Sequence, residues 1–134
     1  MIIDTSAVIA VLRAEPEADR FIDLLATEAR CRMSAATLVE VAVVVDANRD
    51  PVLSRRLDEL IDAADIGIEP LTEQHAALAR QAYRDFGKGS GHPASLNLGD
   101  CFSYALAAAA GEPLLYKGQD FVHTDLASAS GEAR

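Results

Sequence analysis

The chain has 134 residues, half of them hydrophobic and a quarter charged. This length is near the commonest size of one domain and allows a buried core without disulfides or a structural metal, so we expect a single domain over 1–134. Twelve Lys and Arg against 21 Asp and Glu give a net charge of -9, which excludes a protein that holds nucleic acid through general positive potential. A polyanion could bind only where something locally reverses this charge.

Cysteine content and hydropathy predict a soluble cytoplasmic protein. Cys31 and Cys101 form no CxxC pair and indicate no disulfide framework. The apolar start contains Asp4 and has no basic region before it, so we expect no secretory signal. No uncharged apolar run approaches the roughly 20 residues that a membrane-spanning helix needs, because Glu40 and Asp100 interrupt the two best candidates.

Short apolar runs alternate with helical patterns through the first half of the chain. The first run leads through Asp4-Thr5-Ser6 into apolar residues at helical spacing. The β-branched stretch at 36–47 is predicted as a helix that Ser34 could cap, although its composition also permits a strand. Strands are expected at 1–3 and 31–33, and helices at 7–12, 18–29 and 36–47.

The second half continues this alternation. Pro51 follows Asp50 as a helix start, Gly and Pro residues predict a loop at 87–98, and Gly111 ends an Ala-rich helix. Strands separated by helices favour parallel pairing in an α/β layered domain, whose ligands collect at the carboxyl ends of the strands. Helices are expected at 50–64, 72–86 and 100–110, and strands at 66–70 and 113–116.

Three aspartates follow predicted strands or begin a predicted helix. Asp4 comes directly after the first strand and Asp120 shortly after the last one. Asp100 lies in the first turn of an apolar helix, where the helix dipole favours negative charge. Helix capping by Asp4 or Asp100, and a turn at Asp120, are the competing interpretations. Asp125 is a nearby alternative to Asp120.

Glu40 is the only ionisable residue between Met33 and Asp46, in the middle of an apolar helix. An isolated carboxylate there is costly to remove from water, so we expect it to be shifted in pKa, paired, or bound to a cation. The alternative is a place on the one exposed stripe of the helix.

Together these four carboxylates predict one acidic site at the edge of the sheet. Converging carboxylates repel, so they share protons or hold a divalent cation. Oxygen ligands without a His or Cys cluster select Mg²⁺ or Mn²⁺ over Zn²⁺. Such a cation would bind phosphate despite the net charge of -9.

Basic and imidazole side chains give weaker signals. Arg80, Arg84 and Lys88 recur every four residues and could follow an RNA backbone, or could form a solvated helix face. The glycines at 87–91 lack the spacing of a nucleotide-binding phosphate loop. The three histidines are dispersed and predict structural or surface roles.

Four segments, in this order along nearly the whole chain, resemble the PIN-domain ribonucleases, and most closely the VapC-type toxins of type II toxin-antitoxin modules. The more specific parts are the helix start Gly99-Asp100-Cys101 in the third segment and, after a strand, the Gly118-Gln119-Asp120-Phe121 that closes the fourth. The segments are Met1-Ile2-Ile3-Asp4-Thr5-Ser6-Ala7, Leu38-Val39-Glu40-Val41, the stretch 96–107, and the stretch 113–121.

This resemblance implies a three-layer α/β/α fold with a mainly parallel central sheet and Mg²⁺-dependent endoribonuclease activity, with Mn²⁺ as a substitute. It implies Asp4, Glu40, Asp100 and Asp120 as catalytic residues, Asp4 and Asp100 as direct metal ligands, and a hydroxyl of Thr5 or Ser6 that supports Asp4. It also implies a VapB-type antitoxin, an RNA substrate, a homodimer and no membrane association.

Two other functions stay open at this point. Many relatives carry a denser acidic cluster in the last motif than Lys117-Gly118-Gln119-Asp120, which puts a second metal ion in doubt. A PIN-like RNA- or protein-binding module with weak or no catalysis is therefore one alternative. A phosphatase that uses Asp4 as its nucleophile is the other, although Asp4-Thr5-Ser6 lacks the second Asp of such enzymes.

Overall fold

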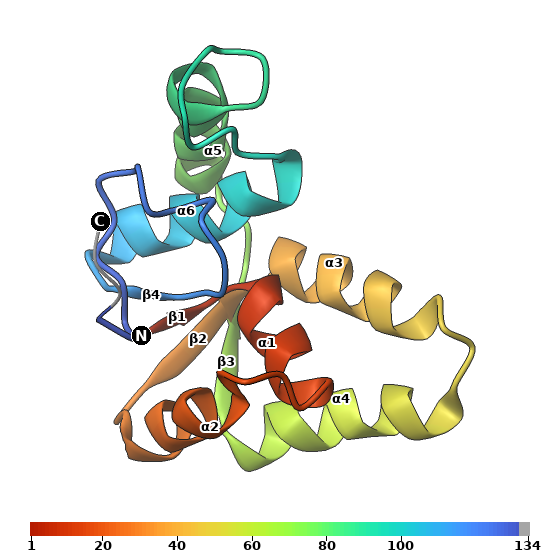
Figure 1. Cartoon of the computed structure of the whole chain (residues 1–134). Helices are drawn as coiled ribbons and strands as arrows, with labels where there is room; N and C mark the ends of the chain where they lie inside the picture. The colour runs from red at the N-terminus through yellow and green to blue at the C-terminus, as the bar shows by residue number, and fades with distance from the viewer. Residues whose placement is uncertain (132–134) are drawn as a thin grey trace.

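The computed structural model describes residues 1–131, and a parallel sheet of four strands forms its centre (Figure 1). The sheet order is β3-β2-β1-β4, and all three neighbouring pairs are parallel. β1 therefore has a neighbour on each side, which places the residue that follows it near the middle of the sheet edge. The strands are β1 (Ile2–Ile3), β2 (Cys31–Ser34), β3 (Ile66–Glu69) and β4 (Leu114–Leu115).

Helices cover both faces of this sheet. Successive strand residues point to opposite faces. Ile3 and Leu115 belong to the core beneath the first four helices, whereas Ile2 and Leu114 belong to the core beneath the last two. The three-layer α/β/α fold expected from the sequence is confirmed (Figure 1). The helices are α1 (Thr5–Leu12), α2 (Ala18–Thr27), α3 (Ala35–Asp46), α4 (Pro51–Ala63), α5 (Glu73–Phe86) and α6 (Leu98–Ala110).

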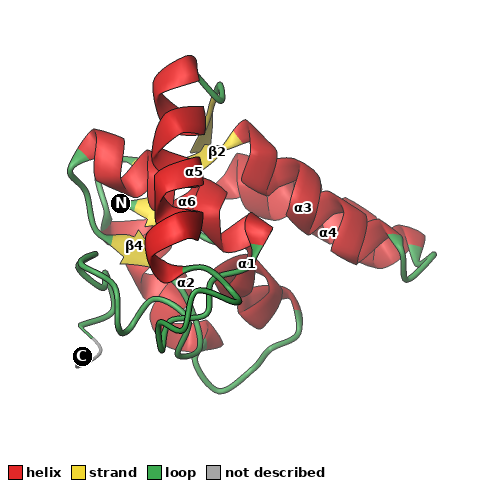
Figure 2. Ribbon diagram, turned by 90° about the horizontal axis from the view of Figure 1, so that it is seen from above, coloured by secondary structure: helices red, strands yellow, loops and turns green. Residues whose placement is uncertain are grey.

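The β-branched segment after β2 is a helix, so its alternative assignment as a strand is wrong. Ser34 begins α3 by accepting a hydrogen bond from the backbone N–H of Ala36 at 3.2 Å. α3 buries Val41 and Val45 and leaves Val39 and Val43 63% and 62% exposed. α3 lies beside α4 (Figure 2) and also contacts α1 and α6. Packing of one side of α3 against the core therefore selects a helix over a strand, which the local composition alone did not.

α6 begins two residues before its predicted start. Asn97 and Asp100 cap it reciprocally, each side chain accepting a hydrogen bond from the other residue's backbone N–H. Gly111 ends the helix in the left-handed conformation, with φ of 65°. The loop before α6 is held by Leu96, whose side chain is fully buried. Asp100 is thus fixed by the helix start on which it lies.

Two large apolar side chains, one on α2 and one on α5, are half exposed. Ile22 of α2 is 45% exposed and Tyr83 of α5 is 46% exposed. Both lie beside buried neighbours on the same helix, so the apolar stripe is wider than the surface that the rest of the chain covers. These residues leave apolar surface in contact with solvent.

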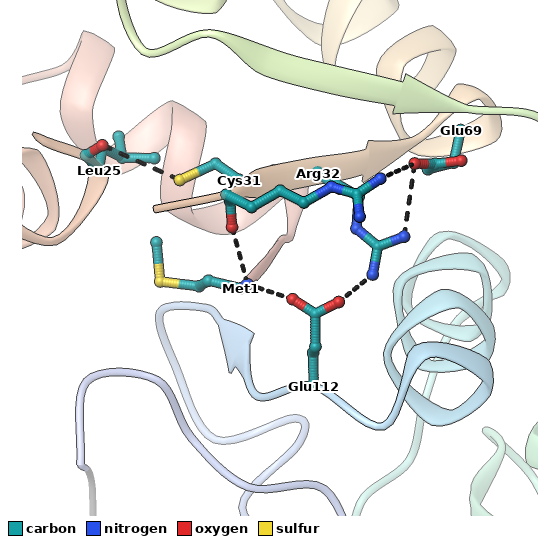
Figure 3. A network of polar contacts seen from close by, with 7 residues as sticks. Met1, Leu25, Cys31, Arg32, Glu69 and Glu112 are labelled. Carbon is teal, nitrogen blue, oxygen red and sulfur yellow. Dashed lines mark hydrogen bonds and ion pairs between the residues drawn. The ribbon is translucent and has the colours of Figure 1, made fainter. Parts of the chain in front are cut away.

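A polar network ties the starts of β1 and β2 to the segment before β4 (Figure 3). Glu112 binds both the amino group of Met1 and the guanidinium of Arg32. Arg32 also contacts Glu69 of β3 at 3.4 Å. The network lies at the amino ends of β1 and β2 and reaches the last residue of β3, whereas Asp4 follows the carboxyl end of β1. Within residues 1–131, no helix is long and apolar enough to cross a bilayer.

Candidate active site

Asp4 lies at the end of β1 and begins α1. It is only 3% exposed. Its Oδ2 accepts hydrogen bonds from the backbone N–H of Ser6 at 3.0 Å and from the Ser6 hydroxyl at 2.7 Å. The Ser6 oxygen in turn accepts a bond from the backbone N–H of Lys117, after β4, at 3.0 Å. Asp4 therefore caps α1 and also belongs to the group of acidic residues described below. Burial raises the pKa of Asp4, and the Ser103 and Ser6 hydrogen bonds oppose the rise.

The other oxygen of Asp4 is held from α6. The Ser103 hydroxyl donates to Asp4 Oδ1 at 2.5 Å. Ser103 also lies 3.3 Å, oxygen to oxygen, from the hydroxyl of Thr37 on α3. Both Ser103 and Thr37 are fully buried. A chain of two hydroxyls thus connects α3 and α6 to the Asp4 carboxylate.

Glu40 extends from α3 to the beginnings of α1 and α6. Its Oε1 accepts a hydrogen bond from the Thr5 hydroxyl. A Cβ atom at Gly99 would overlap the Glu40 carboxylate, so the absence of a side chain at Gly99 provides the space that Glu40 occupies. Burial raises the pKa of Glu40, and the nearby charge of Asp4 adds to the rise. The sequence implied that Thr5 or Ser6 supports Asp4; Ser6 does so, and Thr5 holds Glu40.

Asp100 and Asp120 complete the group. Asp100 is 8% exposed, and burial together with the charges of Asp4 and Asp120 raises its pKa to about 7. Asp120 is exposed in the loop after β4 and shares a side-chain hydrogen bond with Asp100. Asp125 instead accepts a hydrogen bond from the Tyr104 hydroxyl at 2.6 Å. The structure thus brings the four expected carboxylates near one another and gives Asp125 a different partner.

The geometry fits a hydrated hard cation. Among residues 1–131, no three His, Cys, Asp or Glu side chains are close enough to enclose a metal by themselves. Mg²⁺ usually keeps several waters and takes only one or two carboxylates from the protein. Buried carboxylates with raised pKa values hold either protons or a cation. The ammonium of Lys117 does not supply that charge, because it pairs with Glu15 and Glu17.

Sequence reasoning missed three residues that shape the site. Ser103 and Thr37 orient Asp4, and Gly99 makes room for Glu40. One weak signal was present, since Ser103 follows Asp100 by about one helical turn in an otherwise apolar stretch. The roles of Thr37 and Gly99 depend on how closely α3 approaches α6, which no local pattern indicates.

The fold and this site define an α/β/α protein with carboxylates gathered at the carboxyl edge of a parallel sheet. The PIN domain model matches residues 1–126. Ribonuclease VapC28 of Mycobacterium tuberculosis is 57% identical over 129 residues, which cover 96% of this chain and 97% of that protein. The chain belongs to the PIN-domain family, and within it to the VapC ribonucleases.

Solved structures show the same fold at low identity. The chain is similar to Mycobacterium tuberculosis VapC20, described as a Sarcin-Ricin loop cleaving toxin, with a TM-score of 0.72, 15% identity, and 96% and 97% of the two chains covered. It is equally similar to a chain of a toxin-antitoxin complex from Klebsiella pneumoniae, with a TM-score of 0.72, 17% identity and 98% of both chains covered.

Proposed function

We propose that residues 1–134 act as one catalytic domain that hydrolyses RNA phosphodiester bonds within the strand, using Mg²⁺ or, in its place, Mn²⁺. Asp4 and Asp100 are the direct metal ligands of this proposal, and Glu40 and Asp120 are the further catalytic carboxylates. The observation that carries it is the pair of buried aspartates, 3% and 8% exposed, whose pKa values are raised and which no basic side chain among residues 1–131 neutralises.

Each carboxylate has a distinct part in this reaction. A bound divalent cation supplies a water of lowered pKa and neutralises charge on the phosphate. Asp4 is held in one orientation by Ser6 and Ser103, so it offers fixed oxygens to the cation. Glu40 is held by Thr5 and orients the attacking water. Asp120 is exposed and near Asp100, where it would help to orient water at the side open to substrate.

Replacement of Asp4 tests the proposal directly. Loss of a supporting hydrogen bond near a metal costs about 10- to 100-fold, and loss of a ligand costs at least as much, so we expect Asp4→Asn to reduce cleavage by more than about 100-fold. The measurement is gel analysis of cellular RNA incubated with each protein in Mg²⁺ and in EDTA. Unchanged cleavage by Asp4→Asn, or cleavage that persists in EDTA, contradicts the proposal.

The two alternatives make different demands on Asp4. A phosphatase of this kind needs Asp4 as its nucleophile and a second Asp beside it, which Asp4-Thr5-Ser6 lacks. A binding module without catalysis would bind RNA but leave it intact in Mg²⁺ and in Mn²⁺. The same gel therefore separates the nuclease from both alternatives.

We also propose that the chain is the toxin of a type II toxin-antitoxin pair and works in the cytoplasm with a VapB-type antitoxin. The Klebsiella pneumoniae complex supports the antitoxin, and the net charge of -9 suits a basic antitoxin segment. The buried thiols of Cys31 and Cys101 are unpaired, as expected in a reducing compartment.

A homodimer is the oligomeric state that we propose. Val39 and Val43, one turn apart on α3, expose most of their apolar surface to solvent. A second copy that covers them would remove this surface from water. Sedimentation analysis of the wild type and of Val39→Ser with Val43→Ser tests it, because the double variant should sediment as a monomer.

A further inference from the structure

A groove of about 500 Å³ runs between α5 and the beginning of α6. Its volume falls within the range of about 300–1,000 Å³ typical of small-molecule sites. Six of its eight lining residues are apolar or aromatic, two of them the small Ala76 and Ala79, and the other two are basic. The larger side chains are those of Leu71, Tyr83, Leu98, Phe102, Arg80 and Arg84.

The groove adjoins the acidic site. Leu98 is the first residue of α6, and the next residue, Gly99, lies against the Glu40 carboxylate. The Leu98 side chain is 67% exposed, the most exposed of the large apolar side chains within residues 1–131. Helix formation does not need an exposed leucine at this position. An apolar surface next to a catalytic centre indicates contact with a bound molecule.

Positive charge borders this apolar surface. Arg80 and Arg84 are exposed, and within the described part of the chain no carboxylate lies within 4.0 Å of either guanidinium. Arg32 and Lys117, in contrast, are each paired with two glutamates. In a chain of net charge -9, two unpaired arginines beside the site provide a local attraction for phosphate.

Tyr83 lies at the edge of this groove. A Cβ atom at Gly87 would overlap the carbonyl oxygen of Tyr83 and would lie 2.9 Å from its ring atom Cδ1. The ring therefore lies close against the chain that leaves α5, while the residue is 46% exposed. A half-exposed aromatic ring offers a face on which a planar group can stack.

We propose that the groove binds one nucleobase of the RNA next to the cleaved bond, with Tyr83 and Leu98 against the base and Arg80 and Arg84 on the neighbouring phosphates. Unpaired bases are commonly recognised by stacking on aromatic side chains, with cations on the backbone. This inference rests on the proposed ribonuclease function and adds a substrate-binding position to it.

The charge of the groove favours RNA over a second copy of the chain. In a symmetric dimer the same patch of both copies meets, so a contact through this groove would bring the unpaired arginines of the two copies toward each other. An RNA strand supplies a planar apolar group and negative charge together. The groove needs both from its occupant.

Binding of modified RNA to Tyr83 variants tests the inference. The probe is a fluorescein-labelled single-stranded RNA of 12 nucleotides, in a series in which each nucleotide in turn is abasic, and the readout is fluorescence anisotropy in EDTA, where the RNA stays intact. We expect Tyr83→Ala to weaken binding of the intact RNA roughly tenfold, as for the loss of one stacked base, and Tyr83→Phe to retain the affinity. One abasic position should weaken binding to the wild type by the same factor and leave binding to Tyr83→Ala unchanged.

The arginines have a matched control. Arg84→Gln should reduce the slope of log Kd against log salt by about 0.7, as expected for one lost phosphate contact to a single strand. Arg56→Gln makes the same charge change on the exposed surface of α4 and should leave that slope unchanged. Equal slopes for the two variants overturn the role of Arg84.

Failure of the inference is distinct from failure of the proposed function. The base-binding groove is overturned, whether or not the protein cleaves RNA, if the wild type and Tyr83→Ala bind RNA with equal affinity. It is also overturned if the losses of affinity caused by Tyr83→Ala and by each abasic position multiply when the two changes are combined. A Tyr83→Ala protein that becomes monomeric in sedimentation while it keeps its RNA affinity identifies the groove as a contact between copies. The proposed nuclease activity is tested separately, by cleavage of RNA in Mg²⁺ and by the loss of that cleavage in Asp4→Asn.

Discussion

Asp4 combines two roles that are usually considered alternatives. Its Oδ2 caps α1 through Ser6, and its carboxylate is also the most deeply buried of the four acidic groups. The capping bond uses lone pairs of one oxygen and leaves further lone pairs on both oxygens. Strand end, helix start and proposed ligand therefore coincide in one residue. Asp100 also combines capping with a proposed ligand role, because it is the acidic member of the capping box of α6.

Asp100 should make the metal-free protein less stable as the pH rises. It binds its proton more tightly in the folded chain, where its pKa is about 7, than at its ordinary value of 3.8. The free energy of unfolding therefore falls as the pH rises from about 4 to about 7 through this group. In EDTA, we expect Asp100→Asn to have a higher urea midpoint than the wild type at about pH 8, and a smaller difference at about pH 4. An equal difference at both pH values contradicts this expectation.

Ser103 should affect metal binding more than stability. Ser103→Ala removes the donor to Asp4 Oδ1, so we expect Mn²⁺ affinity, measured by calorimetry, to fall about 10- to 100-fold. The free energy of unfolding should fall by only about 1 kcal/mol. Asp50→Ala, which removes the cap of α4, is the matched control: it should cost a similar amount of stability and leave Mn²⁺ affinity unchanged.

At the scale of elements, the sequence was sufficient for the order of strands and helices and for the place of three carboxylates. Periodicity predicts each helix, and Asp4 and Asp120 follow strands whose carboxyl ends share an edge. The start of α6 was missed because Leu98 and Gly99 are weak signals for a helix that Asn97 caps. Glu40 could be recognised as unusual but not located, since its place depends on α3 lying against α6.

The two glycines at opposite ends of α6 should respond differently to alanine. Gly99→Ala displaces the Glu40 carboxylate, so we expect cleavage to fall roughly 10- to 100-fold while the free energy of unfolding changes by less than about 1 kcal/mol. Gly111→Ala introduces a side chain where φ is 65°, which should cost about 1–2 kcal/mol and leave cleavage unchanged. RNA cleavage and urea unfolding of both variants measure the contrast.

For the whole molecule, an acidic chain can still bind phosphate, because the acidic residues of the site are arranged differently from the rest of the negative charge. The net charge of -9 is spread over the chain, whereas buried carboxylates gather at the carboxyl edge of the sheet. Composition excluded binding through overall potential, and it could not indicate where a cation would locally reverse the sign. That required the sheet topology, which brings residues 4 and 100 together.

A divalent cation should stabilise the whole fold. A ligand that binds only the folded chain at 100 times its Kd adds about 2.7 kcal/mol to the free energy of unfolding. We expect Mn²⁺ at that concentration to raise the urea midpoint of the wild type correspondingly and to leave Asp4→Asn nearly unchanged. An equal gain in both proteins would show that Mn²⁺ binds elsewhere.

The contact of Lys117 with Glu15 and Glu17 has a consequence for how salt acts on this protein. Lys117 lies three residues before Asp120, and its ammonium joins that loop to the segment between α1 and α2. Dissolved ions therefore act at two points: they screen the approach of RNA, and they weaken the ion pairs that hold the loop of Asp120, the exposed carboxylate of the proposed site. The first effect changes KM and the second changes kcat, so the salt dependence of the two constants should separate substrate capture from the alignment of the site.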